Sequence, residues 1–250
     1  LQLAALDYQL YTMAHGIRHS AEKLEGSVRL AATEGLAGVF LASAIVDFQT
    51  DYPNIQLHIK TPTNVNDIRQ NMADIMIGFS DSQNSDVTVK KLGYLHFVPM
   101  ASKQYISKFG IPSESSLSRH KFVDSEFYHA KTPIWEGWQK LTGIGKVVSY
   151  CDSSLAYGVA VRKGQGIGLL GTYLLDDETF VAVDLGYSAS VQMYAQVLTE
   201  RLQAPSVKAV FDWLPSIFGQ HLDWFSKTPN LKRPRSHGLA TMLNGFFGAA

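Results

Sequence analysis

The segment KLEGSVRLAATEG, Lys23 to Gly35, changes its hydrophobic spacing at Gly26. Before this glycine, apolar residues recur at alternating intervals of three and four. After it, Val28, Leu30 and Ala32 occupy every second position. The first spacing is typical of a helix and the second of a β-strand, and the glycine provides a helix stop between them. The sequence therefore predicts an N-terminal helix that leads directly into the first strand of an α/β protein.

The N-terminal helix carries a narrow apolar stripe with coiled-coil spacing. Its apolar members are Leu3, Leu6, Leu10, Met13, Ile17 and Leu24, and Ser20 is the one polar residue in the series. Because this spacing keeps one edge of a helix against a partner, we expect residues 1–25 to form a linker helix that pairs with a second subunit. The alternative is an amphipathic helix packed on its own domain. Since the sequence opens in mid-helix, we also expect further residues before Leu1.

Strand and helix patterns alternate along the first eighty residues. The predicted elements are strand 27–32, helix 36–52, strand 55–59, helix 66–72 and strand 75–77. Repeated strand–helix–strand crossovers of this kind form a parallel sheet covered by helices.

A second round of alternation follows. The predicted elements are extended segments 94–101 and 190–198, strands 122–123, 147–151, 167–170 and 181–185, helices 103–109, 133–141, 154–162 and 206–218, and a loop over 110–118. We therefore expect an α/β fold of two Rossmann-like subdomains joined by two crossover strands, an arrangement that resembles type 2 periplasmic binding proteins. Residues 27–97 with 193–225 would form subdomain I, residues 98–192 subdomain II, and residues 226–250 a tail to which we assign no function.

The composition excludes several classes of protein. Lys and Arg number 22, as do Asp and Glu, and the pI is about 7.3, so the chain lacks the strong basic excess of a nucleic-acid-binding domain. Its single cysteine, Cys151, rules out an intrachain disulfide and a thiolate zinc site. The sequence shows no stretch as long as a membrane span and no secretory leader. We expect a cytoplasmic protein.

The glycine motif GQGIG, Gly164 to Gly168, resembles a dinucleotide fingerprint but lies in the wrong order. A phosphate-binding loop follows a strand and opens a helix, whereas this motif follows helix 154–162 and precedes strand 167–170. We interpret Gly164 as a left-handed helix terminator and Gly166 and Gly168 as close-packed turn positions.

Catalytic and metal-binding patterns are equally weak. The eight histidines show no metal-ligand spacing, and no serine lies in a nucleophile elbow. The alternative is an enzyme with Cys151 or Glu34 in its cleft. A Cys151→Ser variant that kept any detected turnover would leave little support for this alternative. We expect no catalytic residue, no metal and no cofactor.

Small polar residues follow the predicted strands, where open α/β sheets bind ligands. We expect effector contacts from Thr33, Glu34, Gly35, Thr61, Thr63, Asp124, Ser125, Ser153 and Ser154, with Phe79, Met100 and Tyr157 as apolar walls. Two such rims facing each other would form a cleft for a small molecule. The alternative is that each Ser or Thr only caps its own helix. The acidic residues disfavour a simple dicarboxylate ligand.

Four motifs, in this order, resemble the regulatory part of LysR-type transcriptional regulators. They are LEGSVRLAATEG, FQTDYPNIQLHI, MADIMIGF and VAVRKGQGIGLLGTYLL. Two positions depart from the family pattern. Asn71 replaces a usual glycine, and Gly171 stands where a proline is common and is expected to make the nearby rim more flexible.

The resemblance implies an effector-sensing and oligomerisation module of a bacterial transcription factor. In this family the linker helix pairs two subunits and carries winged helix-turn-helix domains, which would precede Leu1. The implied partners are a small-molecule effector, further copies of the chain in a homodimer or homotetramer, and promoter DNA and RNA polymerase through the full-length protein only. Effector binding would alter the arrangement of subunits and the bending of DNA. The alternative is a free-standing solute-binding protein, which would be a monomer at micromolar concentration.

Overall fold

The computed structural model describes residues 24–61 and 73–229. The stripe residues Leu3 to Ile17, helix 66–72, Asn71, Thr63 and most of the tail lie outside the described residues. The chain divides into two compact units. Unit 1 contains the residues up to Thr33 with Leu41–Lys91 and Tyr194–Ile217, and unit 2 contains Glu34–Phe40, Leu92–Met193 and the residues from Phe218 on. The subdomain boundaries expected from the sequence stay a prediction.

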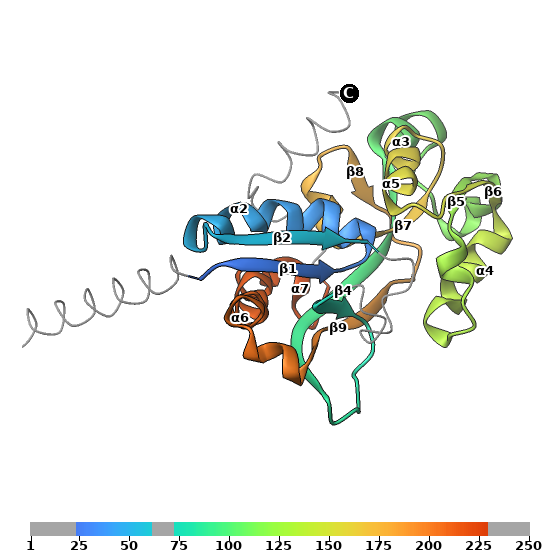
Figure 1. The fold of residues 1–250 in the computed structure, drawn as a ribbon. Helices are drawn as coiled ribbons and strands as arrows, with labels where there is room; N and C mark the ends of the chain where they lie inside the picture. Colours follow the sequence, from blue (N-terminus) through green and yellow to red (C-terminus); the bar gives the residue numbers. More distant parts are fainter. Residues whose placement is uncertain (1–23, 62–72, 230–250) are drawn as a thin grey trace, which may run out of the picture. The chain divides into compact units, whose positions relative to one another are not determined.

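Unit 1 is built on strands in the order β2-β1-β3-β9 (Figure 1). Strand β1 (Gly26–Ala31) pairs in parallel with β2 (Ile55–Lys60) and with β3 (Ile75–Gly78). Strand β9 (Ala189–Leu198) pairs antiparallel to β3. The parallel pairing predicted for the first eighty residues is confirmed. Strand β3 is buried along its whole length, as its uninterrupted apolar sequence requires.

The helix predicted over residues 36–52 is present, with one irregularity. It opens with a π-helical turn, η1 (Leu36–Leu41), and continues as α2 (Ala42–Asp51). A π-helical turn is rare and occurs frequently at functional sites. Phe48 of α2 packs on Trp213 of α6 (Pro205–Gln220), with ring centroids 4.7 Å apart.

The aspartate of the motif MADIMIGF, Asp74, is a buried carboxylate of unit 1 that is held by two arginines. Asp74 is 6% exposed, and its Oδ1 accepts from Arg29 Nη2 at 2.8 Å and from Arg201 Nη1 at 3.0 Å. Its Oδ2 accepts from the Arg29 main-chain N–H at 2.9 Å. Burial opposes ionisation, but the hydrogen bonds and charges of the two arginines outweigh it and lower the Asp74 pKa.

Unit 2 holds most of the remaining elements. They are β4 (Val87–Ser102), α3 (Lys103–Phe109), η3 (Glu114–Arg119), β5 (Lys121–Asp124), η4 (Glu126–His129), η5 (Pro133–Trp135), α4 (Glu136–Ile144), β6 (Lys146–Tyr150), α5 (Ser154–Arg162), β7 (Gly168–Gly171), η6 (Thr172–Asp176), β8 (Phe180–Ala182) and α7 (Leu222–Phe225). Strands β7 and β8 pair antiparallel to β4, and β5 pairs in parallel with β6. Strands β4 and β9 each contain residues of both units.

Two expectations in this region were wrong in detail. The segment expected as a loop contains the 3-10 helix η3, which Ser113 and Ser116 cap reciprocally. The strand expected over 181–185 is only three residues long as β8, because the next residues turn at Gly186 with φ 67°. The interpretation of GQGIG is confirmed for Gly164 and Gly166, whereas Gly168 is closely packed but begins strand β7 and is not a turn position. Gly164 has φ 78°, and a Cβ on Gly166 would lie 2.7 Å from the Lys121 carbonyl oxygen.

A buried histidine ties β4 to the end of α7. His96 is fully buried, its Nε2 lies 2.7 Å from the Ser226 carbonyl oxygen, and its Nδ1 lies 2.6 Å from Ser190 Oγ. Because a carbonyl only accepts, Nε2 carries the proton and Nδ1 accepts from the serine hydroxyl. Burial lowers the pKa of His96, and the bond to Ser226 opposes this only in part.

We expect the protein to lose stability as the pH falls below the ordinary histidine pKa of 6.5. The unfolded chain then takes up a proton that folded His96 excludes, which costs up to about 1.4 kcal/mol per pH unit. Thermal unfolding measured between about pH 8 and pH 5.5 should show this slope. A His96→Gln variant should show a shallower slope, and an unchanged slope in that variant would contradict the assignment.

Candidate functional site

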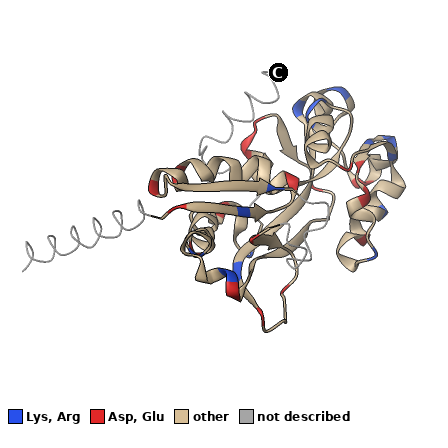
Figure 2. Ribbon diagram, viewed as in Figure 1, with Lys and Arg blue, Asp and Glu red and all other residues tan. Residues whose placement is uncertain are grey.

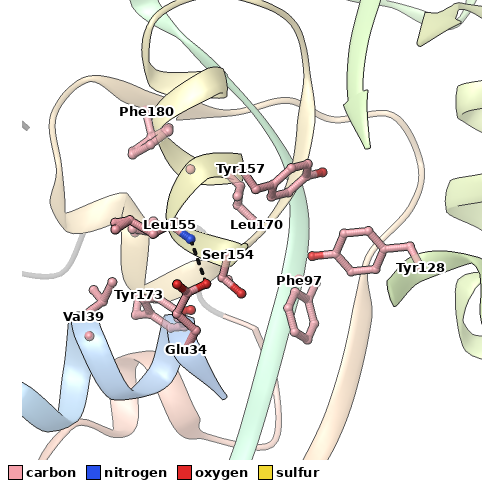
Figure 3. A pocket seen from close by; sticks show the side chains of 15 residues that line it. Glu34, Val39, Phe97, Tyr128, Ser154, Leu155, Tyr157, Leu170, Tyr173 and Phe180 are labelled. Carbon is pink, nitrogen blue, oxygen red and sulfur yellow. Dashed lines mark hydrogen bonds between the residues drawn. The ribbon is translucent and has the colours of Figure 1, made fainter. Parts of the chain in front are cut away.

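Unit 2 contains a cavity of about 170 Å³ whose walls are mainly apolar (Figure 3). An engineered cavity of about this size in another protein binds benzene. The lining residues are Glu34, Gly35, Gly38, Val39, Phe97, Tyr128, Ser154, Leu155, Tyr157, Gly158, Leu170, Gly171, Tyr173, Leu174 and Phe180. They come from the segment 34–39 that includes most of η1, from β4, from η4, from α5 and from the segment 170–180.

Five aromatic side chains form much of the wall, and all are buried: Phe97, Tyr128, Tyr157, Tyr173 and Phe180. Two of the phenol groups are held by the main chain. Tyr128 donates to the Leu169 carbonyl oxygen at 2.7 Å, and Tyr157 donates to the Val123 carbonyl oxygen at 3.1 Å. Burial raises the pKa of both phenols well above the ordinary value. These residues therefore present neutral rings to the cavity.

Glycines open the cavity on two sides. A Cβ built on Gly38 of η1 or on Gly158 of α5 would meet no atom within 4 Å outside its own helix, so side chains there would project into free space. Gly35 and Gly171 make room for Tyr173, since a Cβ on Gly171 would lie 2.5 Å from the Tyr173 Cε1 atom. Gly171 has an ordinary φ of −64°. Gly171 is thus closely packed against Tyr173, and the flexibility expected of the nearby rim stays a prediction.

Glu34 is the charged group of the cavity. Its Oε1 accepts from Ser153 Oγ at 3.1 Å and its Oε2 from the Leu155 main-chain N–H at 3.3 Å. Figure 3 shows this carboxylate directed at the first turn of α5. Ser153 also caps α5 by accepting from the Ala156 N–H at 3.2 Å. A carboxylate is favourable there because a helix N-terminus carries partial positive charge.

The predicted contact residues divide into three groups. Four of them line the cavity: Glu34, Gly35, Ser154 and Tyr157. Ser153 does not line it but donates a hydrogen bond to Glu34. Thr33, Thr61 and Phe79 belong to unit 1. Met100, Asp124 and Ser125 belong to unit 2 but do not line this cavity.

Asp124 performs a structural role. It is fully buried, and its Oδ1 accepts from Trp138 Nε1 at 2.8 Å and from the Ser125 N–H at 2.9 Å. Its Oδ2 lies 2.8 Å from His129 Nε2. Ser125 caps η4 through the Phe127 N–H at 3.3 Å, which agrees with the capping alternative for this residue.

Sequence reasoning missed most of the aromatic wall and two of the glycines. Phe97 precedes Met100 on β4, Tyr128 follows Asp124, and Tyr173 and Phe180 follow GIGLLG. The one available signal was the density of aromatic residues between 94 and 180. Such residues are more often ordinary core, so this signal does not identify a ligand site.

A second cavity in unit 2, about 440 Å³ in volume, has a different character. Three lysines line it, Lys108, Lys121 and Lys163, together with polar groups of Gln104, Ser149 and Gln165. Lys108 and Lys121 each place Nζ 5.4 Å from the centre of the Phe109 ring. Figure 2 shows basic residues near the end of α3. The polar wall makes this cavity less suited to an apolar molecule than the aromatic one.

Within the described parts of the chain, no cluster of three or more His, Cys, Asp or Glu residues is arranged to hold a metal ion. A membrane span is likewise not found among these residues, because none of their helices is long and apolar enough.

Comparison with known proteins identifies the family. The family described as "LysR substrate binding domain" matches residues 21–218, which is well over half of the chain. The chain belongs to the LysR substrate-binding domain family.

Curated relatives of this LysR-family domain are transcriptional regulators. The HTH-type transcriptional activator AaeR of Escherichia coli is 25% identical over 100 residues, 40% of this chain and 32% of AaeR. The matched segment thus spans about a third of that protein. The uncharacterized regulator YhjC of E. coli is 27% identical over 217 residues, 82% of this chain and 72% of YhjC.

Solved structures confirm the fold. The regulatory domain of CrgA from Neisseria meningitidis superposes with a TM-score of 0.65 at 17% identity, covering 78% of this chain and 100% of that one. The AmpR effector-binding domain from Citrobacter freundii gives a TM-score of 0.61 at 21% identity, with the same coverage. The predicted α/β fold of the periplasmic-binding-protein type is confirmed. The family assignment supports the regulatory module and not the free-standing solute-binding alternative.

Proposed function

We propose that this LysR-family domain senses a small, largely apolar effector, which binds in the aromatic cavity of unit 2. The observation that carries the proposal is an apolar cavity bounded by buried rings, with a few polar groups at one side. Such a combination is typical of small-molecule sites, in which apolar walls supply affinity and a few polar groups fix orientation. The polar groups here are Glu34 and Ser154.

We also propose how the subunits pair and which partners the full-length regulator contacts. We infer that the linker helix, residues 1–25, pairs two subunits in a homodimer or homotetramer in the cytoplasm. Promoter DNA and RNA polymerase would be contacted by the full-length regulator. The effector would change the arrangement of subunits only to the extent that it binds one arrangement more tightly than the other.

Filling the open sides of the cavity should abolish ligand binding without unfolding the protein. Gly38→Leu and Gly158→Leu each place a side chain where no atom lies within 4 Å outside the helix itself. Each also replaces a helical glycine, which favours the helix by about 0.5–1 kcal/mol. We expect benzyl alcohol, a neutral probe with one ring, to bind the unmodified chain with a dissociation constant on the order of 1 mM, and neither variant.

Ligand-observed NMR on the full chain measures this binding, and thermal unfolding reports the folding of each variant. Gly143→Leu is the matched control, because Gly143 also lies on a helix and its Cβ would also meet nothing within 4 Å, but it does not line the cavity. This control should bind the probe normally. Unimpaired binding to both cavity variants would rule out the site.

A further inference from the structure

We propose that the cavity selects organic cations, such as aromatic or aliphatic amines, over neutral and anionic molecules of the same size. The inference rests on the proposed function and names the ligand class of that site. The observation is a one-sided distribution of charge. Among the described residues that line the cavity, Glu34 is the one acid, and Lys, Arg and His are absent.

The aromatic wall favours the same sign of charge. The face of an aromatic ring is the negative part of its quadrupole, so it attracts an ammonium group and disfavours a carboxylate. Five rings line this cavity, and the phenol groups of Tyr128, Tyr157 and Tyr173 have pKa values raised by burial. These phenols therefore stay uncharged, and an ammonium group that contacts a ring face would be attracted by it as well as by the Glu34 carboxylate.

The first turn of α5 offers little to an anion, although a helix N-terminus usually attracts one. Three of its main-chain N–H groups are already engaged. The Leu155 N–H donates to Glu34, the Ala156 N–H to Ser153 Oγ, and the Tyr157 N–H to the Ser153 carbonyl oxygen at 2.9 Å. An anionic ligand would have to displace Glu34 to accept from the Leu155 N–H, and it would be repelled by the Glu34 carboxylate if it bound beside it. It would otherwise lose its hydration without gaining a cationic partner.

Glu34 retains the capacity to bind a cation in its present position. Each carboxylate oxygen can accept two hydrogen bonds, and one bond is described for each, from Ser153 to Oε1 and from Leu155 to Oε2. An ammonium N–H can therefore be accepted while both existing bonds are kept. No rearrangement of α5 is required.

The test compares three probes with one ring each: benzylammonium, benzyl alcohol and benzoate. We expect the full chain to bind benzylammonium about tenfold more tightly than benzoate, with benzyl alcohol between them. In Glu34→Gln the benzylammonium affinity should fall about tenfold, and the benzyl alcohol affinity should fall by a smaller factor. Glu34→Asp keeps the charge and should keep the order of the three probes.

The outcomes separate this inference from the proposed function. Benzoate binding as tightly as benzylammonium, or an unchanged benzylammonium affinity in Glu34→Gln, would overturn cation selection. If benzyl alcohol or benzoate then still binds and Gly38→Leu blocks it, the effector cavity itself stands. If none of the three probes binds in a manner that Gly38→Leu blocks, both proposals are wrong.

Discussion

Replacing Asp177 with alanine is expected to lower the free energy of unfolding by about 3–5 kcal/mol. Asp177 Oδ2 accepts from Arg162 Nε at 2.9 Å, and both side chains are 2% exposed. Its Oδ1 accepts from the Thr179 N–H at 2.8 Å. The substitution removes this carboxylate from the buried guanidinium at the end of α5, and loss of one member of a buried ion pair is among the most destabilising changes a point mutation can make.

Urea unfolding of the single variant and of an Arg162→Met, Asp177→Leu double variant measures this effect. The double variant removes both charges and supplies apolar groups, so it should be less destabilised than the single variant. Burial raises the Asp177 pKa, but the bonds from Thr179 and Arg162 outweigh it and the pKa is lowered. The contribution of the pair should therefore be present above about pH 4 and disappear at lower pH. A lower free energy of unfolding for the double variant than for the single variant would contradict this role of the buried pair.

Replacing Gly93 with alanine should cost about 3 kcal/mol or more. Gly93 lies in β4 with φ 114°, a backbone conformation that alanine rarely adopts. A Cβ there would also lie 2.5 Å from the Phe225 carbonyl oxygen. Because that atom belongs to the main chain of α7, it cannot move aside as a flexible side chain would, and overpacking of this kind adds about 1–3 kcal/mol.

Gly110→Ala is the matched control for this prediction. Gly110 follows α3 with φ 82°, and a Cβ on it would meet nothing within 4 Å. An alanine at Gly110 would carry the conformational penalty alone, about 1–3 kcal/mol. Thermal or urea unfolding of both variants should therefore rank Gly93→Ala as the more destabilised. Equal losses would show that the contact with Phe225 is not restrictive.

The order of elements was predictable from local sequence patterns. Alternation of Val28 and Leu30 predicted β1, and the boundaries of α3 and α5 were predicted to the residue. The π-helical turn η1 was not predictable, because its apolar spacing fits an α-helix equally well. The shortness of β8 was also missed, because Val183 continues the apolar pattern after the strand has ended.

The candidate site was only partly predictable, because side-chain direction is set by distant partners. Glu34 and Ser154 follow strands, as expected of ligand contacts in this fold class. Asp124 follows a strand as well, but its carboxylate is turned into the core by the indole of Trp138, fourteen residues later. Nothing at the position of Asp124 in the sequence indicates that bond. The aromatic wall was missed because it is assembled from separate segments of the chain.

The free space beside Gly38 and Gly158 has an evolutionary consequence. The capacity of the cavity depends on two positions where the side chain is simply missing, and a single base change converts a glycine codon into an alanine codon. Each such step would admit a smaller guest while leaving the surrounding rings in place. Recognition in this domain could therefore diversify in small increments, with little loss of folding stability along the way.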